Sequence, residues 1–268
     1  MGLAGCPPTR PAEHPQVQAT VKDADLPADA AALLQFADAE YKKQTAEGMH
    51  NSLKALEKAI LKEKSYETIW RMARAYAWLG DEYQDDERRE EYAQKGIEVS
   101  KQAVALDDKR VEGQYFLATC TGQYAYVKKL KAKDLVPLVL DAAKKAVAAD
   151  EKFDHAGPLR LLGSVYAQAP EPPTSVGDHE EGVKLLARAV SLAGAFPQNH
   201  LLLGDAQRIS DNLDQAEREY QAVIAAQPQQ GWAHRLPKWK AQAEDGLKRV
   251  NNKRRQKNAG DRGTGAGF

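Results

Sequence analysis

Aromatic and arginine side chains recur at helical spacing in three segments of the chain, a pattern that suits a binding surface. In each segment the residues lie three or four positions apart, so one face of a helix would carry them. The three sets are Glu67, Trp70, Arg74 and Trp78; Tyr115, Thr119 and Gln123; and Arg160, Ser164 and Gln168. Aromatic faces beside guanidinium groups suit a ligand with an apolar body and a carboxylate, or a peptide with an acidic end. We predict that these residues form a groove for a ligand or a partner.

The same side chains also have a purely structural interpretation. Trp70 and Trp78 would then fill the space between helices, and the arginines would pair with acids such as Glu67 and Glu112. Both interpretations stay open until the elements that carry these residues are known.

An internal repeat predicts those elements. Residues 197–230 fit the 34-residue tetratricopeptide (TPR) pattern, in which Leu203 and Gly204 belong to the first helix and Ala216, Tyr220 and Pro228 to the second helix and its end. The small residue allows two antiparallel helices to approach, the aromatic ring fills the space between them, and proline stops the second helix. Residues 69–81 and 159–168 repeat the first-helix pattern, and residues 114–124 are a weaker copy.

Counting the repeats predicts an all-α fold, a TPR-like right-handed helical solenoid of about five helix pairs. First helices are expected to start near residues 28, 66, 110, 156 and 197, and a capping helix is expected at 237–250. The inward-facing register of such repeats places the ten residues above on one concave groove. The predicted organisation is a Pro-rich tether over 1–25, a helical domain over 26–250, and a disordered basic and Gly-rich tail over 251–268.

Three of the pairs are longer than a standard repeat. The excess between their two helices is roughly 11, 9 and 7 residues, and these insertions would form loops on one rim. Because loops carry function more often than the elements they connect, that rim is a second candidate surface.

Composition excludes several classes of function. The 38 basic and 38 acidic residues cancel, so charge indicates neither nucleic acid nor an anionic surface as a partner. No metal-binding spacing surrounds the Asp154-His155 or Asp178-His179 pairs, and the Gly-rich C-terminus lacks a following helix to cradle phosphate. No nucleophile or acid–base pair has a catalytic context. We predict a protein that is not an enzyme and has no cofactor or metal; a homo-oligomer is possible.

Cys6 follows Leu3, Ala4 and Gly5, which is the residue order that bacterial lipoprotein processing requires. Four prolines after it indicate an extended spacer. The pattern predicts a lipid on Cys6, the only predicted contact with a membrane, although the apolar stretch of a secretory signal is missing before it. Alternatively, the cysteine match is chance. Cys120 is predicted to be a small packed residue.

Several segments resemble the TatT-like family, the T component of tripartite ATP-independent periplasmic (TRAP) transporters. The most specific are residues 70–75 (WRMARA), 157–163 (GPLRLLG), 169–178 (APEPPTSVGD) and Asn199. This resemblance spans roughly residues 30–250 and implies a lipoprotein with degenerate TPR repeats that partners a periplasmic solute-binding protein. A mitochondrial microtubule-associated TPR family shares the Trp-Arg-x-Ala-Arg segment, but its members lack the Cys6 context.

Three functions are consistent with these observations. The first is a lipid-anchored accessory protein in the bacterial envelope, on the periplasmic face of the outer membrane, that engages a solute-binding protein and an organic-acid ligand. The second is a TPR scaffold lipoprotein whose groove takes a partner peptide during assembly of a secretion or motility complex. The third is a cytosolic TPR adaptor without a lipid.

Overall fold

The computed structural model describes residues 17–129 and 132–264, which form eleven α-helices, one short 3-10 turn and no β-strand. Their order is η1 (Asp23–Asp25), α1 (Ala30–Lys42), α2 (Ala46–Lys62), α3 (Tyr66–Glu82), α4 (Asp86–Leu106), α5 (Val111–Val127), α6 (Ala132–Asp150), α7 (Phe153–Gln168), α8 (His179–Ala193), α9 (Pro197–Ile209), α10 (Leu213–Ala225) and α11 (Leu236–Thr264). Five of these helices start at 30, 66, 111, 153 and 197, close to the predicted starts of first helices. The predicted fold class is confirmed.

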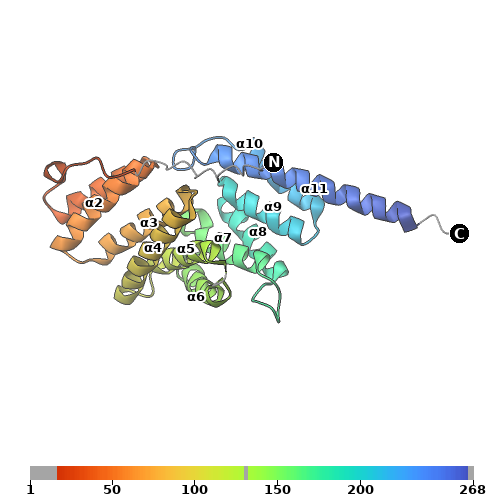
Figure 1. The fold of residues 1–268 in the computed structure, drawn as a ribbon, viewed down its shortest axis with the longest axis horizontal. Helices are drawn as coiled ribbons and strands as arrows, with labels where there is room; N and C mark the ends of the chain where they lie inside the picture. The colour runs from red at the N-terminus through yellow and green to blue at the C-terminus, as the bar shows by residue number, and fades with distance from the viewer. Residues whose placement is uncertain (1–16, 130–131, 265–268) are drawn as a thin grey trace, which may run out of the picture.

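The helices form consecutive hairpins that curve into an arc (Figure 1). Each helix packs on the next along the chain, and each first helix also contacts the first helix of the following pair, from α1 to α3 and onward to α9. Among the described residues the second helices make no such contacts with one another. First helices therefore form the inner layer of the arc, and the second helices are spread along its outer side.

Polar caps start five of the eleven α-helices that the structure describes, where the sequence places a Ser, Thr or Asp. The side chains of Asp29, Thr45, Ser65, Asp85 and Asp178 each accept a hydrogen bond from a backbone N–H of the first turn. Such a bond satisfies one of the backbone donors that a helix start leaves unpaired. Local sequence thus fixes where these helices begin.

The repeat pattern has a direct steric explanation at the last pair. A Cβ added at Gly204 would lie 2.8 Å from the Tyr220 ring, and one added at Gly246 of α11 would collide with the same ring. Tyr220 is fully buried, and its hydroxyl donates to Asp205 at 2.8 Å. Glycine on two facing helices leaves room for this one aromatic ring.

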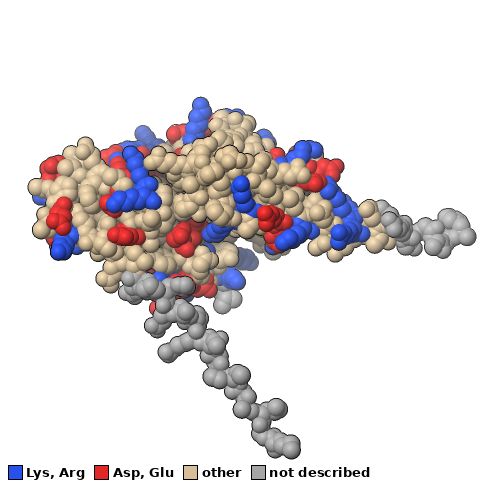
Figure 2. Space-filling model, turned by 90° about the horizontal axis from the view of Figure 1, so that it is seen from above, with Lys and Arg blue, Asp and Glu red and all other residues tan. Residues whose placement is uncertain are grey.

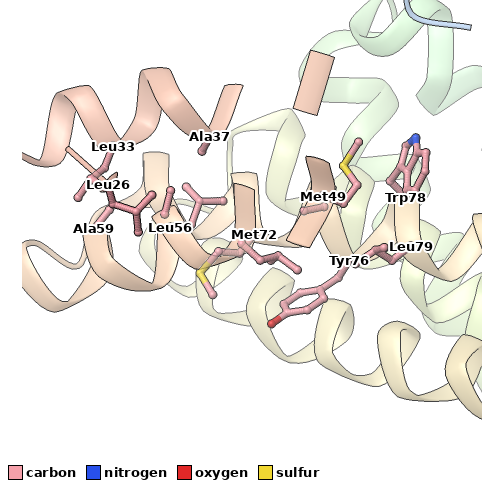
Figure 3. Packing of buried hydrophobic residues seen from close by; sticks show 13 residues of the cluster. Leu26, Leu33, Ala37, Met49, Leu56, Ala59, Met72, Tyr76, Trp78 and Leu79 are labelled. Atoms are coloured by element: carbon pink, nitrogen blue, oxygen red, sulfur yellow. The ribbon is translucent and has the colours of Figure 1, made fainter. Parts of the chain in front are cut away.

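The first three helices enclose the N-terminal part of the core (Figure 3). Leu33 of α1, Leu56 of α2 and Leu79 of α3 are completely buried there. Tyr76 and Trp78 add aromatic surface to the same cluster. Burial of side chains of this size favours folding by about 1.5–3 kcal/mol each, so the cluster ties the first pair firmly to the second.

Both predicted terminal segments differ from expectation. Part of the expected tether lies against α2, because the backbone N–H groups of Thr20 and Val21 donate to Asn51 and Leu26 is buried. The capping helix continues to Thr264, through most of the expected disordered tail. Lys253 and Lys257 pair with Asp211, which explains why this basic helix end stays on the body. Cys6 lies outside the described residues.

Other surface and core predictions can now be compared with the structure. Cys120 is fully buried, and burial raises the pKa of its thiol to about 12, as expected of a small packed residue. Basic and acidic side chains are interspersed over the face that Figure 2 shows, with no large area of one sign. Within the described ranges, no helix combines the length and the apolar character that a bilayer span requires.

Gly204→Ala should lower the free energy of unfolding by about 1–3 kcal/mol, because the new methyl group collides with the buried Tyr220 ring. Gly122→Ala is the matched control: this helical glycine has only Val139 near, at 4.0 Å, so the change should stabilise by about 0.5–1 kcal/mol. Urea denaturation of both variants checks the pair. Equal effects would contradict the packing explanation.

His200 should stabilise the fold in a pH-dependent way. Its Nδ1 lies 2.6 Å from Glu219 Oε2 and its Nε2 lies 2.9 Å from the Gly194 carbonyl oxygen, so the doubly protonated ring donates to both. The Glu219 hydrogen bond raises the pKa of His200 above its usual 6.5, against an opposing effect of burial. The stabilisation is therefore complete below pH 6.5 and lost as pH rises through the raised pKa. The melting temperatures of wild type and His200→Ala should differ most near pH 5.5 and converge above pH 8; a constant gap would refute this.

Candidate functional site

A cavity of about 340 Å³ lies on the inner side of the arc. Its helical lining comes from α1, α3, α5, α7 and α9, the five first helices, and from the start of α11. The second helices contribute no lining residue among those described, and neither do the three inter-helix insertions. We call this the central cavity. The segment 231–239, which follows α10, supplies a further wall, and the cavity remains partly open to solvent.

The central cavity brings together most of the residues that the sequence singled out. Those that line it are Arg74, Trp78, Tyr115, Thr119, Gln123, Arg160 and Ser164. Glu67, Trp70 and Gln168 do not line it; Gln168, the last residue of α7, is exposed. The repeat register thus predicted correctly which helix faces meet, whereas a ligand role for these residues stays a prediction.

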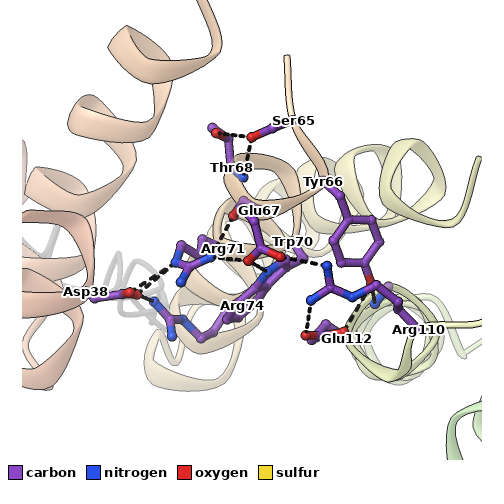
Figure 4. Close-up of polar contacts among 11 residues, drawn as sticks. Asp38, Ser65, Tyr66, Glu67, Thr68, Trp70, Arg71, Arg74, Arg110 and Glu112 are labelled. Atoms are coloured by element: carbon purple, nitrogen blue, oxygen red, sulfur yellow. Dashed lines mark hydrogen bonds and ion pairs between the residues drawn. The ribbon is translucent and has the colours of Figure 1, made fainter. Parts of the chain in front are cut away.

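Glu67 and Trp70 belong instead to a polar network beside the cavity (Figure 4). Glu67 accepts hydrogen bonds from Trp70 Nε1 at 2.8 Å, Arg71 Nη1 at 2.7 Å and Arg110 Nη1 at 2.6 Å. Burial alone would raise the pKa of Glu67, but these three donors outweigh it and lower the pKa to about 2. The structural interpretation therefore fits these two residues.

Arg160 lies at the centre of a second network and is 7% exposed. Its Nη1 donates to the carbonyl oxygen of His155 at 3.1 Å and to Asn199 Oδ1 at 3.1 Å, and its Nη2 pairs with Asp154 at 3.2 Å. Tyr115 donates to the same Asp154 carboxylate at 2.6 Å. The guanidinium is occupied by internal partners, so it has little capacity left for a ligand.

The backbone that these partners hold is unusual. Asp154, His155 and Ala156 have φ values of 48°, 56° and 61°, which is one turn of left-handed helix built without glycine. This conformation costs an L-residue about 1–2 kcal/mol. Arg160 and Asn199 bind its carbonyl groups, Asn199 Nδ2 donating to His155 O at 3.1 Å. Strain of this kind persists only where the surroundings over-determine it, and it concentrates at functional sites.

The left-handed turn places two side chains at the cavity. The His155 ring stacks on Phe196, with centroids 4.6 Å apart and an interplanar angle of 8°, and it meets Trp232 edge to face at 5.2 Å. Phe196 also contacts Trp239 edge to face, at 5.4 Å. These rings form an aromatic wall opposite the polar residues of α3.

The remaining polar groups of the cavity are only partly paired. Arg74 binds Asp38 at 2.5 Å and lies over the Tyr41 ring at 3.9 Å, while Arg235 binds Asp81 at 2.9 Å. Burial raises the pKa of the Tyr41 hydroxyl, and Asp154 adds to this while Arg74 and Arg235 oppose it, so these three charges surround one hydroxyl group. The lining contains three arginines, and each is paired with an aspartate: Arg74 with Asp38, Arg160 with Asp154 and Arg235 with Asp81.

Four buried atoms of the lining residues have no hydrogen-bond partner: Arg74 Nε, Gln123 Oε1, Trp232 Nε1 and Arg235 Nη2. Three of them are donors, and two of these belong to guanidinium groups. A buried donor without a partner costs about 1–3 kcal/mol. A hydrogen-bond acceptor that reached these donors would remove that cost. Elsewhere in the described chain, no group of three or more His, Cys, Asp or Glu side chains is placed to hold a metal ion.

Sequence reasoning missed most of the lining. Tyr41, Asp81, Trp232, Arg235 and Trp239 were not singled out, and the Asp154-His155 pair was considered as a site only for metal binding. Only residues 237–239 of segment 231–239 were assigned, to the start of the capping helix. Two tryptophans and an arginine within nine residues could have indicated that this segment lines a binding surface. The left-handed turn gave no signal because it contains no glycine.

Comparisons with known proteins agree on a helical repeat architecture. A family model described as "Regulator of microtubule dynamics protein 1-3" matches residues 33–152, less than half of the chain. The crystal structure of TTC0263, a thermophilic TPR protein of Thermus thermophilus, is similar with a TM-score of 0.60 at 17% identity, covering 81% of this chain and 98% of that one. The MamA protein structure has a TM-score of 0.47 at 18% identity, covering 72% and 88%. No curated protein matches.

The chain has a TPR-like helical repeat fold. The region that the family model matches includes the Trp-Arg-x-Ala-Arg segment at residues 70–74. The TatT-like family is not established by these comparisons, and the resemblance to it stays a hypothesis about partners.

Ala156→Gly should leave the protein at least as stable as the wild type, because glycine removes the cost of the left-handed conformation. Ala143→Gly, at an equally buried position in the right-handed helix α6, is the control and should destabilise. We expect the two variants to differ by about 2 kcal/mol in the free energy of unfolding. Equal losses in chemical denaturation would show that the turn is unstrained.

Proposed function

We propose that the protein is a non-enzymatic TPR-like binding protein whose central cavity takes a small organic acid. The observation that carries this proposal is the set of unpartnered donors on Arg74, Trp232 and Arg235, three residues that line one cavity. A carboxylate supplies the acceptors that these donors lack.

The shape and the chemistry of the cavity favour a small molecule over a peptide helix. Its volume of about 340 Å³ is at the lower end of the range for small-molecule sites. The aromatic wall of Phe196, Trp232 and Trp239 suits an apolar body. A helix about 10 Å across would need an open groove, whereas here segment 231–239 occupies the space facing α3.

The cellular setting is part of the proposal. The resemblance to the TatT-like family and the Leu-Ala-Gly-Cys6 sequence support an accessory lipoprotein of the bacterial envelope that works with a solute-binding protein. The TPR-like fold equally supports a scaffold role, in which the outer surface binds another envelope protein while the cavity is occupied. Pull-down with a solute-binding protein, with and without the organic acid, separates the two: only the accessory role makes capture depend on the acid.

Calorimetric titration with phenylacetate and octanoate tests the ligand class. We expect the protein to bind at least one of them ten-fold or more tightly than phenylacetamide or octanol, because charged hydrogen bonds contribute about 1.5–3 kcal/mol. Leu202→Trp, which fills the cavity, should abolish binding. The control is Leu138→Trp at a position that is 60% exposed on α6. Binding that survives Leu202→Trp would place the ligand elsewhere, and equal binding of acid and neutral analogue would refute an anion site.

A further inference from the structure

Of the three arginines in the central cavity, Arg160 is the least available to a ligand. Its hydrogen bonds to Asp154, His155, Asn199 and Tyr115 occupy both terminal nitrogens. It also lies over the Phe196 ring, 4.8 Å from the centroid. Arg160 is therefore a positioning residue, which holds the left-handed turn so that His155 and Phe196 form the aromatic wall.

Arg74 is also restrained. Its guanidinium lies over two rings, 3.9 Å from the centroid of Tyr41 and 5.0 Å from that of Trp70, and it pairs with Asp38 at 2.5 Å. Its buried atom without a partner is Nε, the inner nitrogen, which carries a single hydrogen. Because Nη2 is held by Asp38, Arg74 cannot hold a carboxylate through both terminal nitrogens while that ion pair is kept.

Arg235 differs from both. Its Nη1 pairs with Asp81 at 2.9 Å, and the terminal Nη2, which carries two hydrogens, is buried and without a partner. Trp232 stands three residues earlier in the same turn, where the Arg235 N–H donates to the Trp232 carbonyl oxygen at 2.9 Å. Trp232 is 6% exposed, and its Nε1 also has no partner. Residues three apart in such a turn share one face, so both donors can meet one anionic group.

We propose that Arg235 and Trp232 bind the carboxylate of the ligand, and that Asp81 is the internal competitor which this carboxylate displaces or shares. The inference rests on the proposed organic-acid function and specifies its binding residues. The ligand is then oriented with its charged end against segment 231–239 and its body between the aromatic wall and α5.

The position of Arg235 gives this arrangement a structural consequence. Segment 231–239 and α3 meet through the Arg235–Asp81 pair and through Trp78, which lies 5.6 Å from the Arg235 guanidinium and 5.9 Å from the His234 ring. Over their described residues, helices α3 and α11 make no backbone-level contact of their own. The carboxylate therefore binds where segment 231–239 contacts α3. The Arg235–Asp81 ion pair takes part both in acid binding and in holding this contact.

Titration of phenylacetate and octanoate, each beside its neutral analogue, into three variants tests the assignment. Arg235→Gln should weaken acid binding ten-fold or more and leave the neutral analogue within about two-fold, because it removes a charged donor and not a surface. Trp232→Phe, which keeps the ring and removes its N–H, should weaken acid binding about three- to ten-fold. Asp81→Asn should tighten acid binding about three- to ten-fold, since it frees the guanidinium from its competitor.

The opposite signs expected for Arg235→Gln and Asp81→Asn separate a ligand role from a structural one. If the ion pair only holds the cavity closed, both changes weaken acid and neutral analogue together, and the proposal is wrong. Arg188→Gln, at an exposed arginine paired with Glu151, is the matched control and should change nothing. Circular dichroism confirms that each variant is folded. If wild type binds neither acid in preference to its neutral analogue, the organic-acid function fails; if it does, and Arg235→Gln binds the acid equally well, this assignment alone fails.

Discussion

The buried guanidinium of Arg160 is the constraint on which the centre of the molecule depends. A buried charge is tolerated only where hydrogen bonds and an opposite charge surround it, and here those partners come from three first helices. Tyr115 belongs to α5, Asp154 to α7 and Asn199 to α9. Satisfying one cation therefore fixes how three successive pairs sit relative to one another. The same hydrogen bonds hold residues 154–156 in the left-handed conformation. The free energy that this conformation costs is offset by the hydrogen bonds that Arg160 gains.

This constraint explains why the cavity is central. First helices contact first helices along the whole arc, and the second helices are spread on the outside, so the inner faces converge. A small residue lets two of them approach: a Cβ at Gly157 of α7 would lie 2.7 Å from the Tyr115 hydroxyl of α5. Where the residues become larger and polar, as at Arg74 and Gln123, the helices cannot close completely and the space remains. Segment 231–239 then covers it from the far end of the chain.

Whether the sequence predicts a feature depends on how far apart in the chain the interacting residues are. Helix starts depend on caps such as Asp29 and Ser65, within three residues, and the starts of the first helices were predicted within a few positions. The inward register depends on a repeat of about 34 residues, and it correctly grouped Trp78, Tyr115 and Arg160. The wall from segment 231–239 joins residues more than 150 positions apart, Asp81 and Arg235, and no local pattern encodes that contact. The left-handed turn was not predicted for another reason: its stability comes from Arg160 and Asn199, not from its own residues.

The arginines of this chain show why residue type and spacing cannot separate support from binding. Arg71, Arg74, Arg110, Arg160 and Arg235 all lie near aromatic rings, and all have carboxylate partners. What differs is the balance of donors and acceptors around each one. Glu67 accepts from three donors and becomes a structural centre, whereas Arg74 and Arg235 each keep a buried nitrogen unpaired beside the cavity, although Arg74 pairs with Asp38 and Arg235 with Asp81 and His234. Leaving a buried donor unpaired lowers stability, and a ligand that accepts from it restores that loss. Arg89 Nε is also buried without a partner but lies away from the cavity, so the proposed ligand site rests on unpaired donors and a cavity together, and not on an unpaired nitrogen alone.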